Sequence, residues 1–232
     1  MRIDALTLEG FRNYDRQALT FHDSCNVIYG ENAQGKTNLL EAMVYLSCGK
    51  SPRARADREL IGFDRDKAYI LGQMFTRDRE FRTEVELFRG RRRKASVNGV
   101  PAKNNAALSD VLHTVFFSPE DLNLIKNGPA ERRKFIDLEL CQLNKLYVHS
   151  LVSYNRVLLQ RNKLLKELFF HPEYEETLDV WDMQLVQYGK EVIRFREEFI
   201  GQLNEMICEI HRKLSGGKET LKIVYDPNSG SE

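Results

Sequence analysis

The stretch GENAQGKTNLLEA, residues 30–42, contains the most specific pattern in this sequence of 232 residues. It matches G-x-x-x-x-G-K-[ST], with Gly30, Gly35, Lys36 and Thr37 in the fixed positions. In such a loop the glycines let backbone amides face a phosphate, the lysine adds a positive charge, and the hydroxyl binds Mg²⁺. The pattern therefore predicts ATP and Mg²⁺ as cofactors. The expected nucleotide-binding residues are Gly30, Glu31, Asn32, Ala33, Gln34, Gly35, Lys36, Thr37 and Asn38, with Thr37 also a metal ligand.

The sequence on both sides of this loop supports the motif. Residues 25–29 form a short apolar, β-branched run, which predicts a strand before the loop. Residues 37–47 carry apolar side chains at helical spacing, which predicts a helix after it. The expected buried face of this helix consists of Leu39, Leu40, Met43, Val44 and Leu46.

Composition limits the possible functions. The chain has 35 Lys and Arg residues against 34 Asp and Glu, a formal net charge of +1, so no global charge attracts nucleic acid. The four cysteines are far apart in the sequence and show no paired zinc-ligand spacing. We find no apolar run of the roughly 20 residues that a membrane span needs, and no apolar signal segment at the N-terminus. These features predict a cytoplasmic protein with reduced thiols and no membrane partner.

Alternating patterns predict further strands in the first half of the chain. Residues 2–9 and 11–21 read as two strands, so that with residues 25–29 three strands precede the first long helix. Residues 68–75, 80–88 and 94–102 read as three more, with a hairpin turn at Asn98-Gly99. We expect residues 80–88 to place Phe81, Thr83, Val85 and Leu87 on one face of an added antiparallel sheet.

The second half of the chain has a helical character. Ser118 to Asp121 reads as a helix start, and after Pro129 apolar residues recur in steps of three and four, interrupted at Pro172. This pattern predicts an antiparallel arm of two helices, whose apolar stripe serves for packing between them or, alternatively, for binding a partner. Residues 221–226 read as a strand. The expected divisions are 1–128, an ATP-binding lobe; 129–214, the arm; and 215–232, a return toward that lobe.

Three segments together resemble the RecF family of bacterial recombination mediators, which is related to the SMC-type ABC ATPases. They are LEGFRNYDRQALTF at residues 8–21, GENAQGKTNLLEAM at 30–43 and VFFSPEDLNLIKNGPAERRKFIDLEL at 115–140. The resemblance implies an α/β fold: an incomplete ABC-type P-loop ATPase head with an added antiparallel sheet and a helical-hairpin arm. It also implies an ATP-dependent homodimer that binds DNA at single-strand/double-strand gap junctions. Such a protein helps RecO and RecR load RecA, and the full-length form is expected to be a weak ATPase.

The same resemblance implies roles for individual residues. Arg12 and Asn13 would lie against the nucleotide, although a solvated turn between two strands remains the alternative. Glu120 stands where related ATPases carry a glutamine that senses the γ-phosphate and magnesium, so it is a candidate metal ligand. Helix capping is the alternative for that segment, particularly for Asp121.

The sequence departs from the family at its C-terminal side. RecF proteins are longer, and no signature motif or Walker B strand follows Asp226. LSGGK, residues 214–218, imitates the ABC signature but follows a long helical pattern, so we interpret its glycines as a helix end. We expect an N-terminal portion that binds ATP without hydrolysing it, because no catalytic residue is identified.

A run of basic residues lies between two of the predicted strands. We predict that this run contacts DNA phosphates, with a solvated turn as the alternative; it consists of Arg89, Arg91, Arg92, Arg93 and Lys94.

The rival function is a P-loop small-molecule kinase, which would need an arginine-rich lid and an acid for the acceptor. Neither feature is evident in the sequence.

Overall fold

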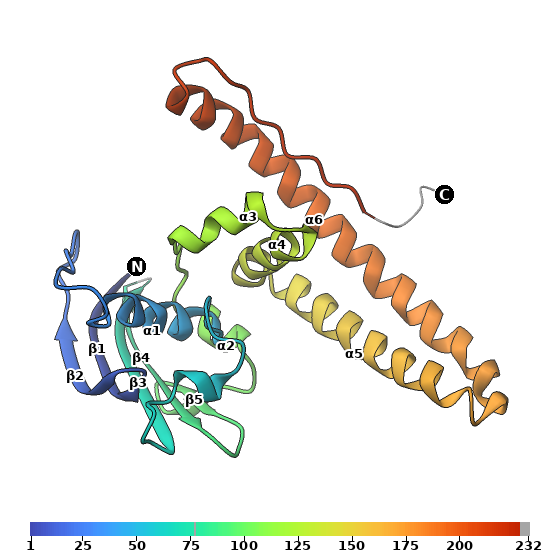
Figure 1. The fold of residues 1–232 in the computed structure, drawn as a ribbon, viewed down its shortest axis with the longest axis horizontal. Coiled ribbons are helices and arrows are strands. Elements are labelled where there is room, and N and C mark those ends of the chain that lie inside the picture. The colour runs from blue at the N-terminus through green and yellow to red at the C-terminus, as the bar shows by residue number, and fades with distance from the viewer. Residues whose placement is uncertain (77, 228–232) are drawn as a thin grey trace. The chain divides into compact units, whose positions relative to one another are not determined.

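The computed structural model describes residues 1–76 and 78–227. The chain forms two compact units, one from Met1 to Lys126 and the other beginning at Asn127. Figure 1 shows a sheet with short helices in the first unit and long helices in the second. Because the positions of the two units relative to each other are not determined, each unit is described separately.

One antiparallel sheet organises the first unit. Its strands are β1 (Arg2–Phe11), β2 (Tyr14–Thr20), β3 (Lys67–Thr76), β4 (Arg79–Phe88), β5 (Lys94–Val97) and β6 (Val100–Pro101), in the order β2-β1-β3-β4-β5-β6. Leu8 pairs with Ile70, and Ile70 pairs with Val85, so the buried residues of three strands share one face. The predicted antiparallel sheet is confirmed. Asn98 and Gly99 both have positive φ, 49° and 76°, as the predicted two-residue hairpin requires.

Helix α1 (Lys36–Cys48) packs on the apolar face of this sheet. Leu39, Ala42, Tyr45 and Leu46 join the strand residues in one core cluster, which excludes water from the helix and the sheet together. The predicted helix is confirmed, but its predicted face is partly wrong. Leu40 is 38% exposed, because the helix turns its Leu39 side toward the strands, and Tyr45 occupies the core instead.

Two predicted strands are absent from the described residues. Residues 25–29 join no ladder, so only two strands precede α1; Ile28 packs on the core, while Val27 and Tyr29 are 79% and 90% exposed. Residues 221–226 are not a strand either, because they lie along α6 (Leu178–Leu214). There the Asn204 amide donates to the Ile223 carbonyl at 2.7 Å and accepts from its N–H at 2.8 Å. A β-strand pattern forms a strand only where a partner can complete its hydrogen bonds.

Short helices complete the first unit. They are η1 (Asp57–Leu60), α2 (Ala106–Ser109), η2 (Pro119–Leu122) and α3 (Asn123–Lys126). The predicted helix start at Ser118 is confirmed, since its N–H donates to the Asp121 carboxylate at 2.6 Å and Pro119 occupies the first helical position. This start opens a 3-10 turn followed by one α-helical turn rather than a longer helix.

The second unit is a helical hairpin with one additional helix. Its elements are α4 (Pro129–Leu143), α5 (Lys145–Glu167), η3 (Pro172–Thr177) and α6. Tyr147 packs against Val192 and Phe195 between α5 and α6, which confirms the predicted arm and its packing stripe. Figure 1 shows α5 and α6 side by side. Across the helices, Arg196 pairs with Asp137 of α4 at 2.6 Å.

The glycines of LSGGK end α6, as the sequence predicts. The Gly217 N–H donates to the Arg212 carbonyl at 2.8 Å, and Gly216 has φ of 62°. These features define a Schellman motif, in which a left-handed glycine satisfies the last carbonyls of a helix. Among the described helices, none is long and apolar enough to cross a membrane.

Gly10 gives a test of the sheet geometry. It has φ of 60°, and a Cβ there would lie 2.7 Å from the Lys67 carbonyl oxygen. We expect Gly10→Ala to lower the free energy of unfolding by at least about 2 kcal/mol, because left-handed backbone strain and a backbone clash add together. Urea unfolding followed by circular dichroism measures this change.

Gly90→Ala is the matched control, since a Cβ at Gly90 meets no atom within 4 Å. Equal stabilities of the two variants would contradict the close approach of β1 and β3 at Gly10.

Candidate nucleotide-binding site

The glycine loop of residues 30–35 turns sharply through residues with positive φ. Gly30 and Gly35 have φ of 146° and 101°, and Ala33 adopts φ of 65°, so the chain turns sharply before α1 begins at Lys36. The first N–H groups of a helix have no acceptor within the helix and carry partial positive charge. The loop therefore brings these donors to a sharp turn at the N-terminus of α1.

Lys36 lies against the loop instead of extending into solvent. Its Nζ donates to the carbonyl oxygens of Gly30 at 2.8 Å and Glu31 at 2.6 Å. Both acceptors are neutral, and a negatively charged phosphate oxygen forms a stronger bond with an ammonium group. The lysine is thus positioned to exchange carbonyls for a phosphate.

The turn between β1 and β2 holds the glycine loop from the side. The Asn13 Nδ2 donates to the Gln34 carbonyl at 3.2 Å, and the Tyr14 hydroxyl donates to the Gly35 carbonyl at 3.0 Å. Burial raises the pKa of the Tyr14 phenol, so this hydroxyl remains a donor at neutral pH. Gly35 has φ of 101°, a conformation that favours glycine, and a Cβ there would also lie 2.6 Å from the Asn13 Oδ1. The structure therefore brings Asn13 to the phosphate cradle, by which we mean the glycine loop of residues 30–35.

The Arg12 side chain has a different partner. Its Nε and Nη2 donate to the two carboxylate oxygens of Glu41 at 2.9 and 2.8 Å, and Nη1 donates to the Glu59 carbonyl at 2.9 Å. Glu41 is fully buried on α1. Glu41 was not among the residues predicted for the site; the available signal was a carboxylate among the apolar residues of the predicted helix. Arg12 stays a predicted nucleotide contact; its described side-chain hydrogen bonds go to Glu41 and to the Glu59 carbonyl.

Thr37 and Glu120, the predicted metal ligands, are both exposed. Hydrogen bonds from its own backbone N–H and from Ser118 lower the pKa of Glu120, with a further contribution from the charge of Arg53. Arg53 in turn donates to the Asn38 Oδ1 at 3.1 Å, next to Thr37. No group of three His, Cys, Asp or Glu side chains in residues 1–76 and 78–227 could hold a metal by itself. A hydroxyl, phosphate oxygens and water suit Mg²⁺ better than such a cluster.

The basic run divides into two kinds of residue. Arg89 donates to the carbonyls of Arg65, Gly62 and Phe63, and Arg93 donates to the Tyr45 hydroxyl, the Gly49 carbonyl and Asn105. These two guanidinium groups hold loops together. Arg91 lies over the Phe88 ring, 3.8 Å from its centroid, and is exposed together with Arg92 and Lys94.

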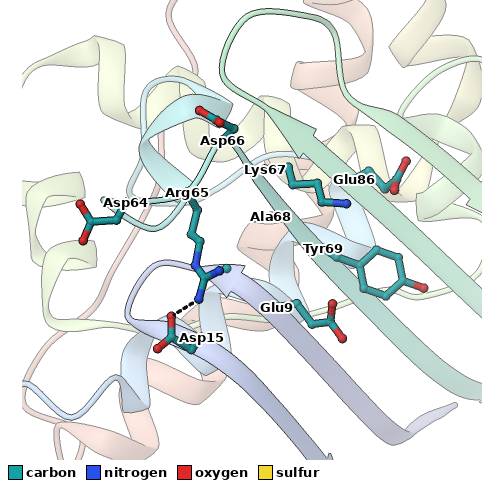
Figure 2. A pocket seen from close by; sticks show the side chains of 10 residues that line it. Glu9, Asp15, Asp64, Arg65, Asp66, Lys67, Ala68, Tyr69 and Glu86 are labelled. Carbon is teal, nitrogen blue, oxygen red and sulfur yellow. Dashed lines mark hydrogen bonds and ion pairs between the residues drawn. The ribbon is translucent and has the colours of Figure 1, made fainter.

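A separate hollow of about 670 Å³ lies at one end of the sheet. Figure 2 shows the acids around it, and Arg65 reaching Asp15 at 3.0 Å. Its lining comprises Glu9, Gly10, Asp15, Asp64, Arg65, Asp66, Lys67, Ala68, Tyr69 and Glu86. None of the predicted nucleotide, metal or DNA residues belongs to this lining.

The chain is similar to known proteins over most of its length. A family model described as AAA domain matches residues 5–216. DNA replication and repair protein RecF of Agathobacter rectalis is 47% identical over 228 residues, covering 98% of this chain. RecF of Lachnospira eligens is 45% identical over 230 residues, again covering 98% of this chain. The chain belongs to the AAA-domain family, and these relatives in sequence are RecF proteins.

A solved structure described as the recombination mediator protein RecF-ATP in the RecFOR pathway has a TM-score of 0.94 and 34% identity over 99% of this chain. The resemblance to RecF and the α/β fold of a partial P-loop ATPase head are thus confirmed. The chain spans 63% of the length of the two curated relatives and 61% of that solved chain.

The division of the basic run can be tested by stability. We expect Arg93→Ala to lower the free energy of unfolding by about 2 kcal/mol, because the buried Tyr45 hydroxyl and Gly49 carbonyl lose their donor. Arg92→Ala should change it by less than about 0.5 kcal/mol, since Arg92 is exposed. Thermal and urea unfolding of the two variants provide the measurement, and equal losses would contradict the division.

Proposed function

We propose that this chain is the nucleotide-binding portion of a RecF-type recombination mediator that binds ATP with Mg²⁺. The observation that carries the proposal is the glycine loop, folded with Lys36 across it and with Asn13 and Tyr14 at its side. The similarity to a solved RecF-ATP structure supports the choice of nucleotide.

In the proposed complex, each part of the loop has a separate task. The backbone amides of residues 31–37 bind the phosphate oxygens, and the N-terminus of α1 stabilises their negative charge. Lys36 moves from the Gly30 and Glu31 carbonyls to the terminal phosphates. The hydroxyl of Thr37 binds Mg²⁺, and Glu120 contributes to the magnesium shell directly or through water.

Two exposed apolar segments support association with further protein. Val27 and Tyr29 precede the loop, and Val115 and Phe117 precede Ser118; all four are large apolar side chains in contact with solvent. We propose that, in a protein of RecF length, further strands pair with these segments and complete the head. ATP would then join two heads in a homodimer.

We further propose that the assembled protein acts on DNA gap junctions, with RecR as direct partner and RecO and RecA in the same pathway, in the cytoplasm. The names RecF and RecFOR belong to the relatives and support this assignment for the present chain. A small-molecule kinase is the less favoured alternative, because all the relatives described above are RecF proteins.

Lys36 tests the nucleotide site. We expect Lys36→Ala to weaken ATP binding by roughly 10- to 100-fold, because a charge-assisted bond to phosphate contributes about 1.5–3 kcal/mol. Calorimetric titration with ATP and Mg²⁺ measures the affinity. Lys67→Ala is the control, since Lys67 lines the separate hollow and should leave binding unchanged. Unchanged affinity in Lys36→Ala would remove the glycine loop from the proposal.

The exposed members of the basic run test DNA binding. We expect the double variant Arg91→Ala/Arg92→Ala to reduce the slope of log affinity against log salt by up to about two units. Each phosphate contact that is lost lowers the number of counterions that the DNA releases on binding by about one. Fluorescence anisotropy with a gapped duplex at several salt concentrations gives the slope. Arg194→Ala is the control, because its guanidinium already pairs with Glu191 and Glu198. If the double variant retains the original slope, this run does not contact DNA.

A further inference from the structure

Glu41 is a fully buried carboxylate one helical turn beyond Thr37. A buried charge is costly unless an opposite charge and hydrogen bonds compensate it. Arg12 supplies this compensation through two parallel bonds of 2.9 and 2.8 Å to the two carboxylate oxygens. Such a fork fixes direction as well as distance, so the carboxylate determines where the β1–β2 turn lies.

The same carboxylate also holds the segment that follows α1. The Ser51 hydroxyl donates to its Oε1, and the Arg53 Nη1 lies 3.9 Å from its Oε2. The Ser51 oxygen in turn accepts the backbone N–H groups of Arg53 at 2.9 Å and Ala54 at 2.7 Å. Glu41 is therefore the common acceptor for two loops that are 40 residues apart in the sequence.

The β1–β2 turn contacts the glycine loop directly, and the segment after α1 contacts Asn38 in the first turn of α1. Arg12 is followed by Asn13 and Tyr14, which donate to the Gln34 and Gly35 carbonyls. On the other side, Arg53 donates to the Asn38 Oδ1 at 3.1 Å, and the Asn38 Nδ2 donates to the Asn13 Oδ1 at 2.9 Å. A continuous set of hydrogen bonds thus connects the buried carboxylate with the phosphate-binding backbone.

We propose that Glu41 is a positioning residue for the nucleotide site. Its carboxylate holds the β1–β2 turn against the glycine loop and the Ser51–Ala54 segment against Asn38 of α1, which in turn contacts Asn13. These contacts keep the phosphate-binding amides in place before the nucleotide arrives. This inference deepens the proposed function and rests on it, because it concerns the site of the same nucleoside triphosphate. Preorganised donors reduce the ordering that a ligand must impose when it binds.

The set of partners separates this role from ordinary core packing. The described hydrogen bonds and ion pairs of Glu41 all come from Arg12, Ser51 and Arg53, in the two loops, and none comes from the sheet. Leu39, Ala42 and Leu46 of the same helix already provide its apolar contacts with the strands. The carboxylate therefore orients loops that border the cradle.

A double-mutant cycle tests the proposal. ATP–Mg²⁺ titrations compare the unaltered protein, Glu41→Gln, Asn13→Ala and the double variant at a temperature where all are folded. We expect each single variant to bind ATP about tenfold more weakly, and the double variant to bind no more weakly than the weaker single variant. This non-additivity follows because Glu41 acts through the turn that carries Asn13. Hydrogen exchange at the amides of residues 34–37 should be faster in Glu41→Gln.

Glu84→Gln is the matched control. The Glu84 carboxylate is also part of the first unit and accepts from Tyr69, Arg82 and Ser96, but it does not contact the glycine loop. This variant should keep both the original ATP affinity and the original exchange rates at residues 34–37.

Several outcomes would overturn the proposal. Unchanged ATP affinity in folded Glu41→Gln would do so, and so would strictly additive losses in the cycle. If Glu41→Gln does not fold, Ser51→Ala and Arg12→Lys replace it, because each weakens one contact of Glu41 and keeps the carboxylate. Unchanged ATP affinity in both variants would also overturn the proposal. If the unaltered protein does not bind ATP, the proposed function itself fails. The outcomes for the Glu41, Ser51 and Arg12 variants are distinct from that failure, because each is measured relative to an unaltered protein that binds ATP.

Discussion

The packing of α1 on the antiparallel sheet is the constraint on which the rest of the structure depends. The helix must bury Leu39, Tyr45 and Leu46 against the strands, while the first N–H groups at its N-terminus have no acceptor within the helix. These two conditions fix the direction of the helix. Residues 30–35 must therefore turn the chain sharply just before α1 begins at Lys36. Positive φ values at Gly30 and Gly35 are the direct consequence.

Much of this arrangement was predictable because its causes are local. A glycine-lysine-threonine pattern specifies a loop before a helix, period-two alternation specifies strands, and Asn98-Gly99 specifies a tight hairpin. The end of α6 at Gly216 is equally local, since a left-handed glycine satisfies carbonyls within its own last turn. In each of these cases the residues that determine the conformation are within a few positions of one another.

The parts that were not predicted depend on partners distant in the sequence. Arg93 belongs to a basic run, yet the Tyr45 hydroxyl and the Gly49 carbonyl draw it into the protein. The buried charge of Glu41 on α1 is compensated by Arg12, which comes from the turn between β1 and β2. Residues 25–29 have the composition of a strand but no partner among the described residues, so their hydrogen-bonding groups form no ladder. Composition and periodicity contain no information about such pairings.

The unpaired segment before the glycine loop changes which interactions can stabilise the cradle. In a sheet, ladder hydrogen bonds would fix the direction from which the chain enters the loop, but residues 25–29 have none. Ile28 contributes one apolar contact with the core on that side. On the other side, the loop has the packed α1 and the polar contacts from Asn13 and Tyr14. Since hydrogen bonds depend on direction and apolar contacts do not, the polar set and its anchor at Glu41 determine the orientation of the loop carbonyls and amides.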